Sequence, residues 1–154
     1  MKREYYGTTR VLSLIGASMT DCIFCKIVAG EISSHKVYED DQFLAFLDIN
    51  PVNPGHTLVI PKKHYANLEA TPADTLQGLI VTVKKVAVAV VKGTAAEGFN
   101  IGLNNGRVAG QIVDHIHSHI MPRRAEDGHE LWHGKPYAEG QAAAAAEKIR
   151  QALA

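Results

Sequence analysis

The 154-residue sequence has only two cysteines and lacks a long apolar segment. No apolar run approaches the ~20 residues that a transmembrane helix needs. Lysine and arginine together number 16, and so do aspartate and glutamate, so the chain has no basic surplus of the kind that drives non-specific binding to nucleic acids. We therefore expect neither a membrane nor a nucleic acid as a partner of this chain.

The length and composition predict a single globular domain. A chain of this size can form one core without disulfides, and 46% apolar with 21% charged residues is typical of a folded protein. Residues 1–18 differ from the rest, and their apolar run, Val11 to Ala17, is about as short as the core of a signal peptide can be. We interpret residues 1–18 as an N-terminal extension, or as the product of a start codon placed upstream of Met19. Residues 19–154 then form the domain.

The most unusual stretch is Gln111 to Arg123, in which His115, His117 and His119 alternate with other residues. Side chains of a β-strand point to opposite faces in turn, so a strand here would place the three imidazoles on one face. Pro122 would end this strand because it has no N–H for the ladder. Three adjacent imidazolium ions would repel one another, so most of these histidines must be neutral near pH 7. Such a row can bind a metal ion, or one imidazole can act as a nucleophile while its neighbours bind phosphate oxygens; the alternative is a polar strand with incidental histidines.

The remaining patterns predict mostly antiparallel strands and one long helix, which is an α+β fold. The long helix should begin with Thr71 as its cap and Pro72 at its first position, and it should end at Gly93. A short helix is expected after a cap at Asp21, with Gly30 as its stop. The other predicted elements are strands over Lys36–Glu39 and Phe43–Leu47 joined as a hairpin, a buried strand over His56–Pro61, a strand over Phe99–Leu103, and a terminal helix over Gln141–Ala154.

Gly110-Gln111, the His-x-His-x-His run and the apolar pair Ile120-Met121 resemble the histidine-triad (HIT) family. The resemblance extends from about Asp21 to Arg123, which is most of the chain. It implies the HIT fold, a five-stranded, mostly antiparallel sheet with one long and one or two short helices. It also implies a homodimer in which two protomers join their sheets into one ten-stranded sheet, although the sequence itself shows no oligomer. The Cys-x-x-Cys start and the Pro-Lys-x-His segment are similar to the Hint-like, purine nucleoside phosphoramidase branch.

The resemblance implies that the chain cleaves a purine nucleoside 5′-monophosphate from a leaving group, as in a phosphoramidate, through a nucleotidyl-histidine intermediate and without a catalytic metal. His117 matches the nucleophile of the family. His119 and His56 match the histidines that orient the phosphate, and His115 completes the catalytic set. Neutral imidazole suits this chemistry because its pKa lies near the working pH. The third histidine is not replaced by glutamine, as it is in the uridylyltransferase branch, which favours hydrolysis over transfer.

Six further positions match residues of the family that contact the substrate: Asp48 for the ribose, Asn104, Gly110 and Gln111 for the phosphate and leaving group, and Ile27 and Ile49 for the base. A carboxylate can accept hydrogen bonds from both ribose hydroxyls. From the residues alone, Asp48 could instead cap the turn that it begins, and the two isoleucines could belong to the core. Ile112 departs from the family, where serine or threonine is frequent and can assist the leaving group, so the leaving-group preference of the family is not carried over to this chain.

Cys22 and Cys25 have the spacing Cys-x-x-Cys, which in a reducing compartment is typical of half a metal site or a redox pair. On a helix the two side chains would share one face. The resemblance implies that His64 and His115 complete a tetrahedral Cys₂His₂ site for structural zinc, in a cytoplasmic protein. The alternative is a pair of buried apolar thiols.

Three other functions stay open from the sequence. The first is hydrolysis of dinucleoside polyphosphates, as in the fragile-histidine-triad branch. The second is a metallohydrolase with a His-x-His strand, but its barrel would typically need ~250 residues, and only His129 and His133 follow as further ligands. The third is a non-catalytic nucleotide-binding or interaction module.

Overall fold

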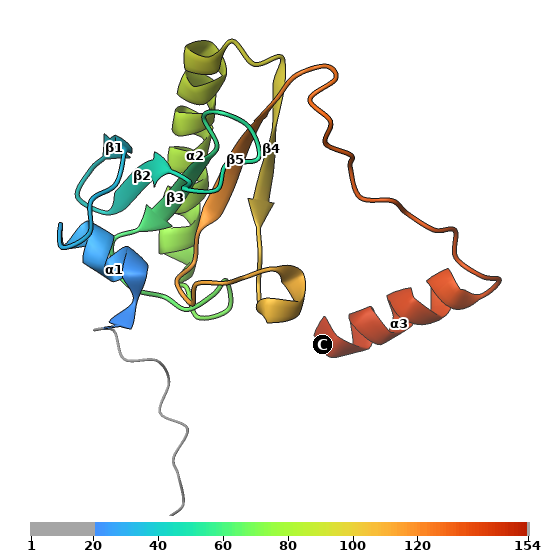
Figure 1. Ribbon diagram of the computed structural model, residues 1–154. Helices are drawn as coiled ribbons and strands as arrows, with labels where there is room; N and C mark the ends of the chain where they lie inside the picture. Colours follow the sequence, from blue (N-terminus) through green and yellow to red (C-terminus); the bar gives the residue numbers. More distant parts are fainter. Residues whose placement is uncertain (1–20, 154) are drawn as a thin grey trace, which may run out of the picture.

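The computed structural model describes residues 21–153, and these form an α+β fold (Figure 1). The predicted extension over residues 1–18 and the start at Met19 lie outside the described residues. Among the described helices, none has both the length and the apolar content that crossing a membrane requires. In chain order the elements are α1 (Ile23–Val28), β1 (Lys36–Glu39), β2 (Phe43–Leu47), β3 (Thr57–Pro61), α2 (Ala73–Thr94), β4 (Gly98–Leu103), the 3₁₀-helix η2 (Arg107–Ala109), β5 (Ser118–Arg123) and α3 (Gln141–Leu153).

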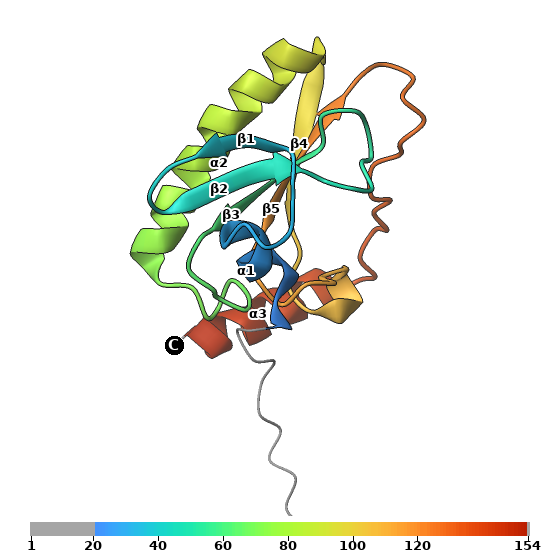
Figure 2. The same cartoon turned by 60° about the vertical axis from the view of Figure 1, so that its left-hand side comes forward.

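The five strands form one antiparallel sheet in the order β1-β2-β3-β5-β4. The long helix α2 covers one face and the short helix α1 lies on the other (Figures 1 and 2). Alternate residues of the central strands therefore enter two different cores. Ala45 and Val59 pack with α2, while Phe46 and Leu58 pack with α1. A central sheet buried on both faces explains why β2 and β3 are apolar nearly throughout.

Most of the predicted elements are confirmed. The hairpin strands β1 and β2 have the predicted bounds, and the carboxylate of Asp40 closes their turn by accepting the backbone N–H groups of Gln42 and Phe43. The buried strand, the strand before the triad and the terminal helix differ from their predicted bounds by one residue at most. As predicted, α3 is exposed and has no buried residue.

The strand predicted across the histidine run is wrong in its extent. β5 begins only at Ser118, so His115 and His117 precede it in an irregular segment. β3 continues beyond Val59, the partner of Ser118, but β5 does not continue beside it. There the carbonyl of Pro61 accepts a hydrogen bond from the ring Nε2–H of His115 at 2.8 Å instead of from a neighbouring strand. The ring of His115 thus takes the place of a backbone hydrogen bond between β3 and β5. Because His115 and His117 lie outside the strand, the alternation of strand side chains does not apply to all three histidines.

Pro122 does not end this strand, contrary to the prediction. It lies within β5 and pairs with Phe99 of β4. Its carbonyl accepts a hydrogen bond from the side-chain amide of Asn53 at 2.9 Å. In an antiparallel strand the N–H and C=O of one residue point to the same side, which for Pro122 is the side of β3. β3 begins only at Thr57, opposite Ile120, so no residue of β3 lies opposite Pro122. The missing N–H therefore leaves no ladder hydrogen bond unmade.

The start of α2 also differs from the prediction. Pro72 occupies the N-cap position, and no side chain caps the helix. The hydroxyl of Thr71 donates to the carbonyl of Asn67 at 2.7 Å instead of capping α2. At the other end, Gly93 lies inside the last turn, and the helix ends at Ala95, which adopts a left-handed conformation with φ of 52°.

The stop predicted for α1 is confirmed, but its cap is not. The N-cap is Cys22 rather than Asp21, and no side chain makes the cap hydrogen bond. At the C-terminus Gly30 has φ of 79°, and the N–H of Glu31 returns to the carbonyl of Lys26 at 2.9 Å. Glycine adopts this backbone conformation without a steric cost, which allows the chain to turn sharply into β1.

Candidate active site

Three histidines converge on the face of the sheet that carries α1. His119 pairs with Leu58 across β5 and β3, so both side chains enter this face, and His56 precedes Leu58 by two residues. The ring centroids of His56 and His119 lie 5.1 Å apart, and those of His117 and His119 lie 5.0 Å apart. Of the predicted catalytic set, His56, His117 and His119 therefore form one cluster, whereas the ring of His115 belongs to a neighbouring group.

The hydrogen bonds assign the protons of two of these rings. The backbone N–H of Val52 donates to Nδ1 of His56 at 3.2 Å, so a neutral His56 carries its proton on Nε2. That Nε2–H faces Nδ1 of His119 at 2.9 Å, which must then accept. The proton of a neutral His119 consequently sits on its Nε2. Within residues 21–153 this buried nitrogen has no hydrogen-bond partner, so it can serve a bound ligand as a donor.

His117 has the opposite tautomer. Its Nδ1–H donates to the backbone carbonyl of His115 at 2.7 Å, which leaves the lone pair of Nε2 unprotonated. The ring is 6% exposed, and Phe24 of α1 packs against it edge to face with centroids 5.2 Å apart. A neutral imidazole with a bare Nε2 and a fixed orientation has the properties of a nucleophile.

Burial keeps the neighbouring rings neutral. It lowers the pKa of His119 to about 4, and the like charges that His117 and His56 would carry lower it further. Burial also lowers the pKa of His56, although the nearby carboxylate of Asp48 opposes this. Asp48 lies 3.8 Å from Nε2 of His56 and 4.0 Å from Nδ1 of His119. Because both imidazoles are neutral at pH 7, these contacts are not ion pairs.

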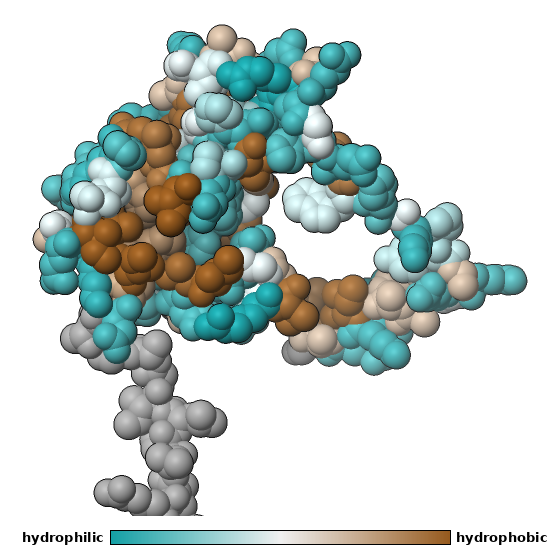
Figure 3. Space-filling view, in the orientation of Figure 1, coloured by the Kyte–Doolittle hydropathy of each residue, from teal (hydrophilic) through white to brown (hydrophobic). Residues whose placement is uncertain are grey.

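Asp48 has two roles, one for each oxygen. Its Oδ1 accepts the backbone N–H of Asn50 at 2.8 Å and closes the turn, while its Oδ2 faces the histidines. The residue also lines a cleft of about 340 Å³ between α1 and the end of β2. Ile27 lies in the wall of this cleft and is buried, whereas Ile49 is 89% exposed at its rim. Figure 3 shows apolar side chains gathered over α1 and the adjacent strands.

The residues expected near a phosphate lie in the loop before the triad. Gln111 is 3% exposed, and its side-chain amide donates to the carbonyls of Ala66 at 2.6 Å and Val113 at 3.1 Å. Its Oε1 accepts the N–H of Gly106 at 2.9 Å, so this side chain braces the loop. Gly110 is exposed with φ of 90°, and its carbonyl accepts from Asn104 at 3.4 Å. Contact of these residues with a phosphate stays a prediction.

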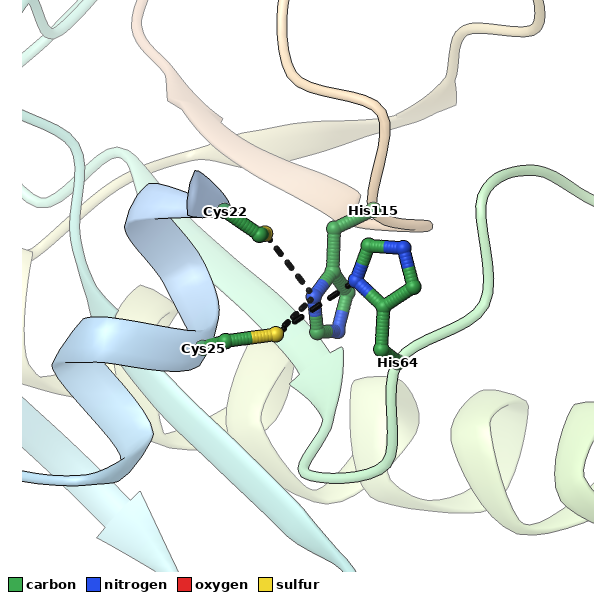
Figure 4. Close-up of side chains that lie close together, drawn as sticks. All are labelled: Cys22, Cys25, His64 and His115. Carbon is green, nitrogen blue, oxygen red and sulfur yellow. Dashed lines mark hydrogen bonds between the residues drawn. The ribbon is translucent and has the colours of Figure 1, made fainter. Parts of the chain in front are cut away.

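The four residues predicted as zinc ligands converge at the N-terminus of α1 (Figure 4). Their donor atoms all lie within 4.8 Å of one another. Nδ1 of His115 is 3.5 Å from Sγ of Cys22 and 3.7 Å from Sγ of Cys25, and Nδ1 of His64 is 3.4 Å from Sγ of Cys25. With Zn–S of about 2.3 Å and Zn–N of about 2.05 Å, a sulfur and a nitrogen on a tetrahedral zinc ion are about 3.6 Å apart. The donor set therefore fits tetrahedral zinc.

The protonation of this cluster suits a metal ion as well. Because Nε2–H of His115 donates to the carbonyl of Pro61, its Nδ1 presents a lone pair to the thiols. Burial lowers the pKa of His115 to about 4 and raises the pKa of the Cys25 thiol to about 11. The imidazole is thus ready to bind, while the thiol must lose its proton when a metal binds.

A second group of metal-ligating types fits a metal less well. Asp48, His56 and His119 also have donor atoms within 4.8 Å of one another. However, Nε2 of His56 and Nδ1 of His119 are 2.9 Å apart and share a proton, whereas two nitrogens on one tetrahedral zinc ion would be about 3.3 Å apart. This geometry is that of a hydrogen bond between two imidazoles.

Several parts of the site could not be found from sequence patterns. Phe24 and Ser34 carry no motif, yet Phe24 packs on His117 and Ser34 lines the cleft. The hydroxyl of Ser34 is buried and has no hydrogen-bond partner among the described residues. The N–H of Val52 and the carbonyl of Pro61 are backbone groups, so residue types give no signal for them. They nevertheless assign the tautomers of His56 and His115.

Comparison with known proteins places these features in context. Residues 29–126 match the family model described as the HIT domain. The chain is 55% identical over 114 residues to an uncharacterized HIT-like protein from Methanocaldococcus jannaschii, which covers 74% of this chain and 88% of that protein. It is 43% identical over 114 residues to a protein from Candida albicans named adenosine 5′-monophosphoramidase, with 71% and 75% covered. A zinc-bound histidine triad family protein from Mycobacterium smegmatis has a similar structure, with a TM-score of 0.69, 39% identity, and 88% and 99% covered.

Proposed function

Because this chain belongs to the HIT family, as its matched residues and its relatives establish, we propose that it hydrolyses purine nucleoside 5′-phosphoramidates. The predicted family and fold are confirmed. The family includes proteins named as nucleotide hydrolases, among them the Candida albicans phosphoramidase. The observation that carries the proposal is the unprotonated Nε2 of His117, whose ring is fixed by the carbonyl of His115 at 2.7 Å.

The reaction would proceed in two displacements at phosphorus. In the first, Nε2 of His117 attacks the phosphorus, the bond to the leaving amine breaks, and the amine departs with the electron pair and a proton taken from solvent. In the second, water attacks the same phosphorus and gives up a proton to solvent, and the bond to His117 breaks with its electron pair returning to Nε2, which releases the nucleoside monophosphate. The unpartnered Nε2–H of His119 supports this reaction, because it can donate to a phosphoryl oxygen whose charge develops in the transition state.

Recognition of the nucleoside would use the cleft beside the histidines. Oδ2 of Asp48 faces the imidazoles at 3.8 to 4.0 Å, which suits a ribose whose 5′-phosphate reaches His117. The apolar side chains of Ile27 and Ile49 line the same cleft, where they could hold the two faces of a base. Ile112 is 79% exposed and offers no hydroxyl to a leaving group, so we do not carry over the amine preference of family members with serine there.

A panel of substrates tests this function and its alternatives. We expect turnover of adenosine 5′-monophosphoramidate, with AMP as the product, and much slower cleavage of diadenosine polyphosphates. Release of AMP is measured by chromatography at equal substrate concentrations. Faster cleavage of diadenosine polyphosphate would favour the runner-up substrate class. Binding of AMP without turnover of any member of the panel would identify a non-catalytic nucleotide-binding module.

The cluster of Cys22, Cys25, His64 and His115 would hold a structural zinc ion, and the fit of its donor distances to a tetrahedron supports this. We expect about one zinc per chain in protein made without an affinity tag or chelator under zinc-replete growth. Elemental analysis by mass spectrometry measures the ratio. A Cys22→Ser/Cys25→Ser variant serves as the control and should contain none. If wild-type protein from such growth contained no zinc, the two cysteines would be ordinary buried thiols and the proposed zinc site would be wrong.

Exposed apolar residues support the proposed homodimer. β4 lies at one edge of the sheet, and its residues Phe99 and Ile101 are more than 40% exposed. Ile80, Val81 and Val88 on the adjacent helix α2 are also exposed. An apolar edge strand next to an apolar helix face is a site for association. Pairing of β4 with β4 of a second copy would extend the sheet to the ten strands that the family resemblance implies.

A further inference from the structure

We propose that the Cys₂His₂ cluster positions the nucleophile, because three of its ligands, His115 and the two cysteines, are tied directly to the surroundings of His117. The proposal rests on the proposed function only in naming His117 as the nucleophile. One connection runs through His115, and the other runs through helix α1. Figure 4 shows both components meeting at the cluster, with Cys22 and Cys25 on α1 and the ring of His115 facing them.

The first connection is the residue His115 itself. Its ring is fully buried and is held from both sides, by the carbonyl of Pro61 at Nε2 and by the two thiols at Nδ1. The backbone carbonyl of the same residue accepts Nδ1–H of His117 at 2.7 Å. This segment lies before the start of β5, and the peptide that bears this carbonyl is held through its own N–H, that of Ile116, which donates to the carbonyl of Tyr65 at 2.7 Å. Tyr65 directly follows His64 in the chain. Anchoring of the His115 and His64 rings at the cluster therefore helps to hold this peptide, and with it the tautomer and the orientation of His117.

The second connection is α1. This helix has only six residues, and within residues 21–153 no side chain caps its N-terminus. A helix of that length is not stable by itself. It carries Phe24, which packs edge to face on His117 at 5.2 Å and on Phe46 of the sheet at 5.5 Å. It also carries Ile27, which lines the nucleoside cleft. A metal bound by Cys22 and Cys25 would cross-link α1 to the loop after β3 and to the histidine segment, and so hold both walls in place.

The two connections predict a local effect of metal loss. None of the four ligands belongs to the core between α2 and the sheet, so that core should survive without metal. What should change is the position of α1 and of the His115 carbonyl. His117 would then exchange between its two tautomers, and the cleft would bind nucleotide less tightly. A purely structural metal would instead change global stability and leave the ring of His117 as it is.

The experiment compares zinc-loaded wild-type protein, the same protein after chelation, and the Cys25→Ser variant. ¹⁵N-labelled histidine reports the tautomer of each ring by NMR, and a His117→Gln spectrum assigns the His117 signals. In the zinc-loaded protein we expect one protonated nitrogen and one bare nitrogen for His117. In the other two samples we expect averaged signals and several-fold weaker binding of AMP, while hydrogen exchange of β2 and β3 stays slow. Lys26→Ala, a change on α1 outside the cluster and the cleft, is the matched control and should behave as wild type.

A second variant keeps the proposal testable if Cys25→Ser does not fold. Phe24→Leu retains all four ligands, so zinc content and the tautomer of His117 should be kept while AMP binding and turnover fall. Unchanged His117 signals after zinc removal would overturn the connection through His115. AMP binding and turnover equal to wild type in the Phe24→Leu variant would overturn the connection through α1. A full-length chain that takes up no zinc would overturn the whole proposal. Failure of the proposed function looks different: zinc-loaded protein would show the fixed tautomer of His117 but form no nucleotidyl adduct and turn over no phosphoramidate, whether or not it binds AMP.

Discussion

Replacement of His117 by alanine should abolish turnover of a nucleoside phosphoramidate, with a loss of roughly 10³-fold or more, while binding of AMP stays largely intact. His117 is the one ring of the cluster whose Nε2 is left unprotonated by its hydrogen bond to the protein. His56 and His119 donate through Nε2 in their neutral forms, so neither can replace it without a change of tautomer. The proposed nucleoside site, Asp48 and the apolar cleft, does not include His117, which is why binding should survive.

The proposed covalent intermediate gives this expectation a second, more specific readout. Rapid quenching followed by mass spectrometry should show one added nucleoside monophosphate on the peptide that contains His117. Two in-line displacements should also retain the configuration at a chiral phosphorus. His133→Ala is a suitable control, because the side chain of His133 is 83% exposed and its hydrogen bond joins it to Glu130, outside the histidine cluster. An adduct on His119 or His56, or inversion at phosphorus without any adduct, would refute the assignment of His117 as nucleophile.

Local patterns were sufficient for much of the fold. The hairpin of β1 and β2 has polar turn residues between two short β-prone runs, and the turn is closed by Asp40 within the same segment. The helix α3 is similarly defined by its own alanine-rich sequence. In these elements the deciding contacts join residues that are close in the sequence, so periodicity and turn chemistry predict them.

Contacts between distant residues decided the parts that were not predicted. The histidine run has the alternation of a strand, yet His115 bonds to Pro61, 54 residues earlier, and the run is irregular up to Ser118. Gln111 is similar, since its side-chain amide donates a hydrogen bond to the carbonyl of Ala66, 45 residues earlier in the chain. The hydroxyl of Thr71 donates to the carbonyl of Asn67, and it does not accept a hydrogen bond from the first N–H groups of α2. A pattern in one sequence does not indicate which of several possible hydrogen-bond partners a polar side chain will have in the folded protein.

The sequence predicted which residues form the candidate site better than it predicted their arrangement and protonation. The sequence singled out His56, His117 and His119, and the structure brings them together, but their tautomers depend on backbone groups that the sequence cannot rank. For Asp48 the sequence allowed either a turn cap or a ligand for ribose. The structure shows the turn hydrogen bond through Oδ1 and leaves Oδ2 toward the cleft, so the first interpretation does not exclude the second.

Replacement of Asp48 by asparagine tests the role of Oδ2. Asparagine keeps an oxygen for the turn hydrogen bond to Asn50, so the local backbone should be preserved. It removes the charged carboxylate that would accept hydrogen bonds from the ribose hydroxyls. A hydrogen bond to a charged group contributes about 1.5–3 kcal/mol to binding. We therefore expect roughly 10- to 150-fold weaker binding of AMP, but little change for its 2′,3′-dideoxy analogue, which has no hydroxyls to bind.

Calorimetric titration of both ligands into both proteins gives a thermodynamic cycle that isolates the diol interaction from other effects of the substitution. Asp41→Asn, at an exposed position in the β1–β2 turn, is the matched control for loss of one carboxylate and should leave both affinities unchanged. If AMP and the dideoxy analogue weaken equally in Asp48→Asn, then the carboxylate acts only through the turn or through its neighbours His56 and His119. Ribose recognition would then have to come from another group in the cleft, and the buried, unpartnered hydroxyl of Ser34 would be the first to examine.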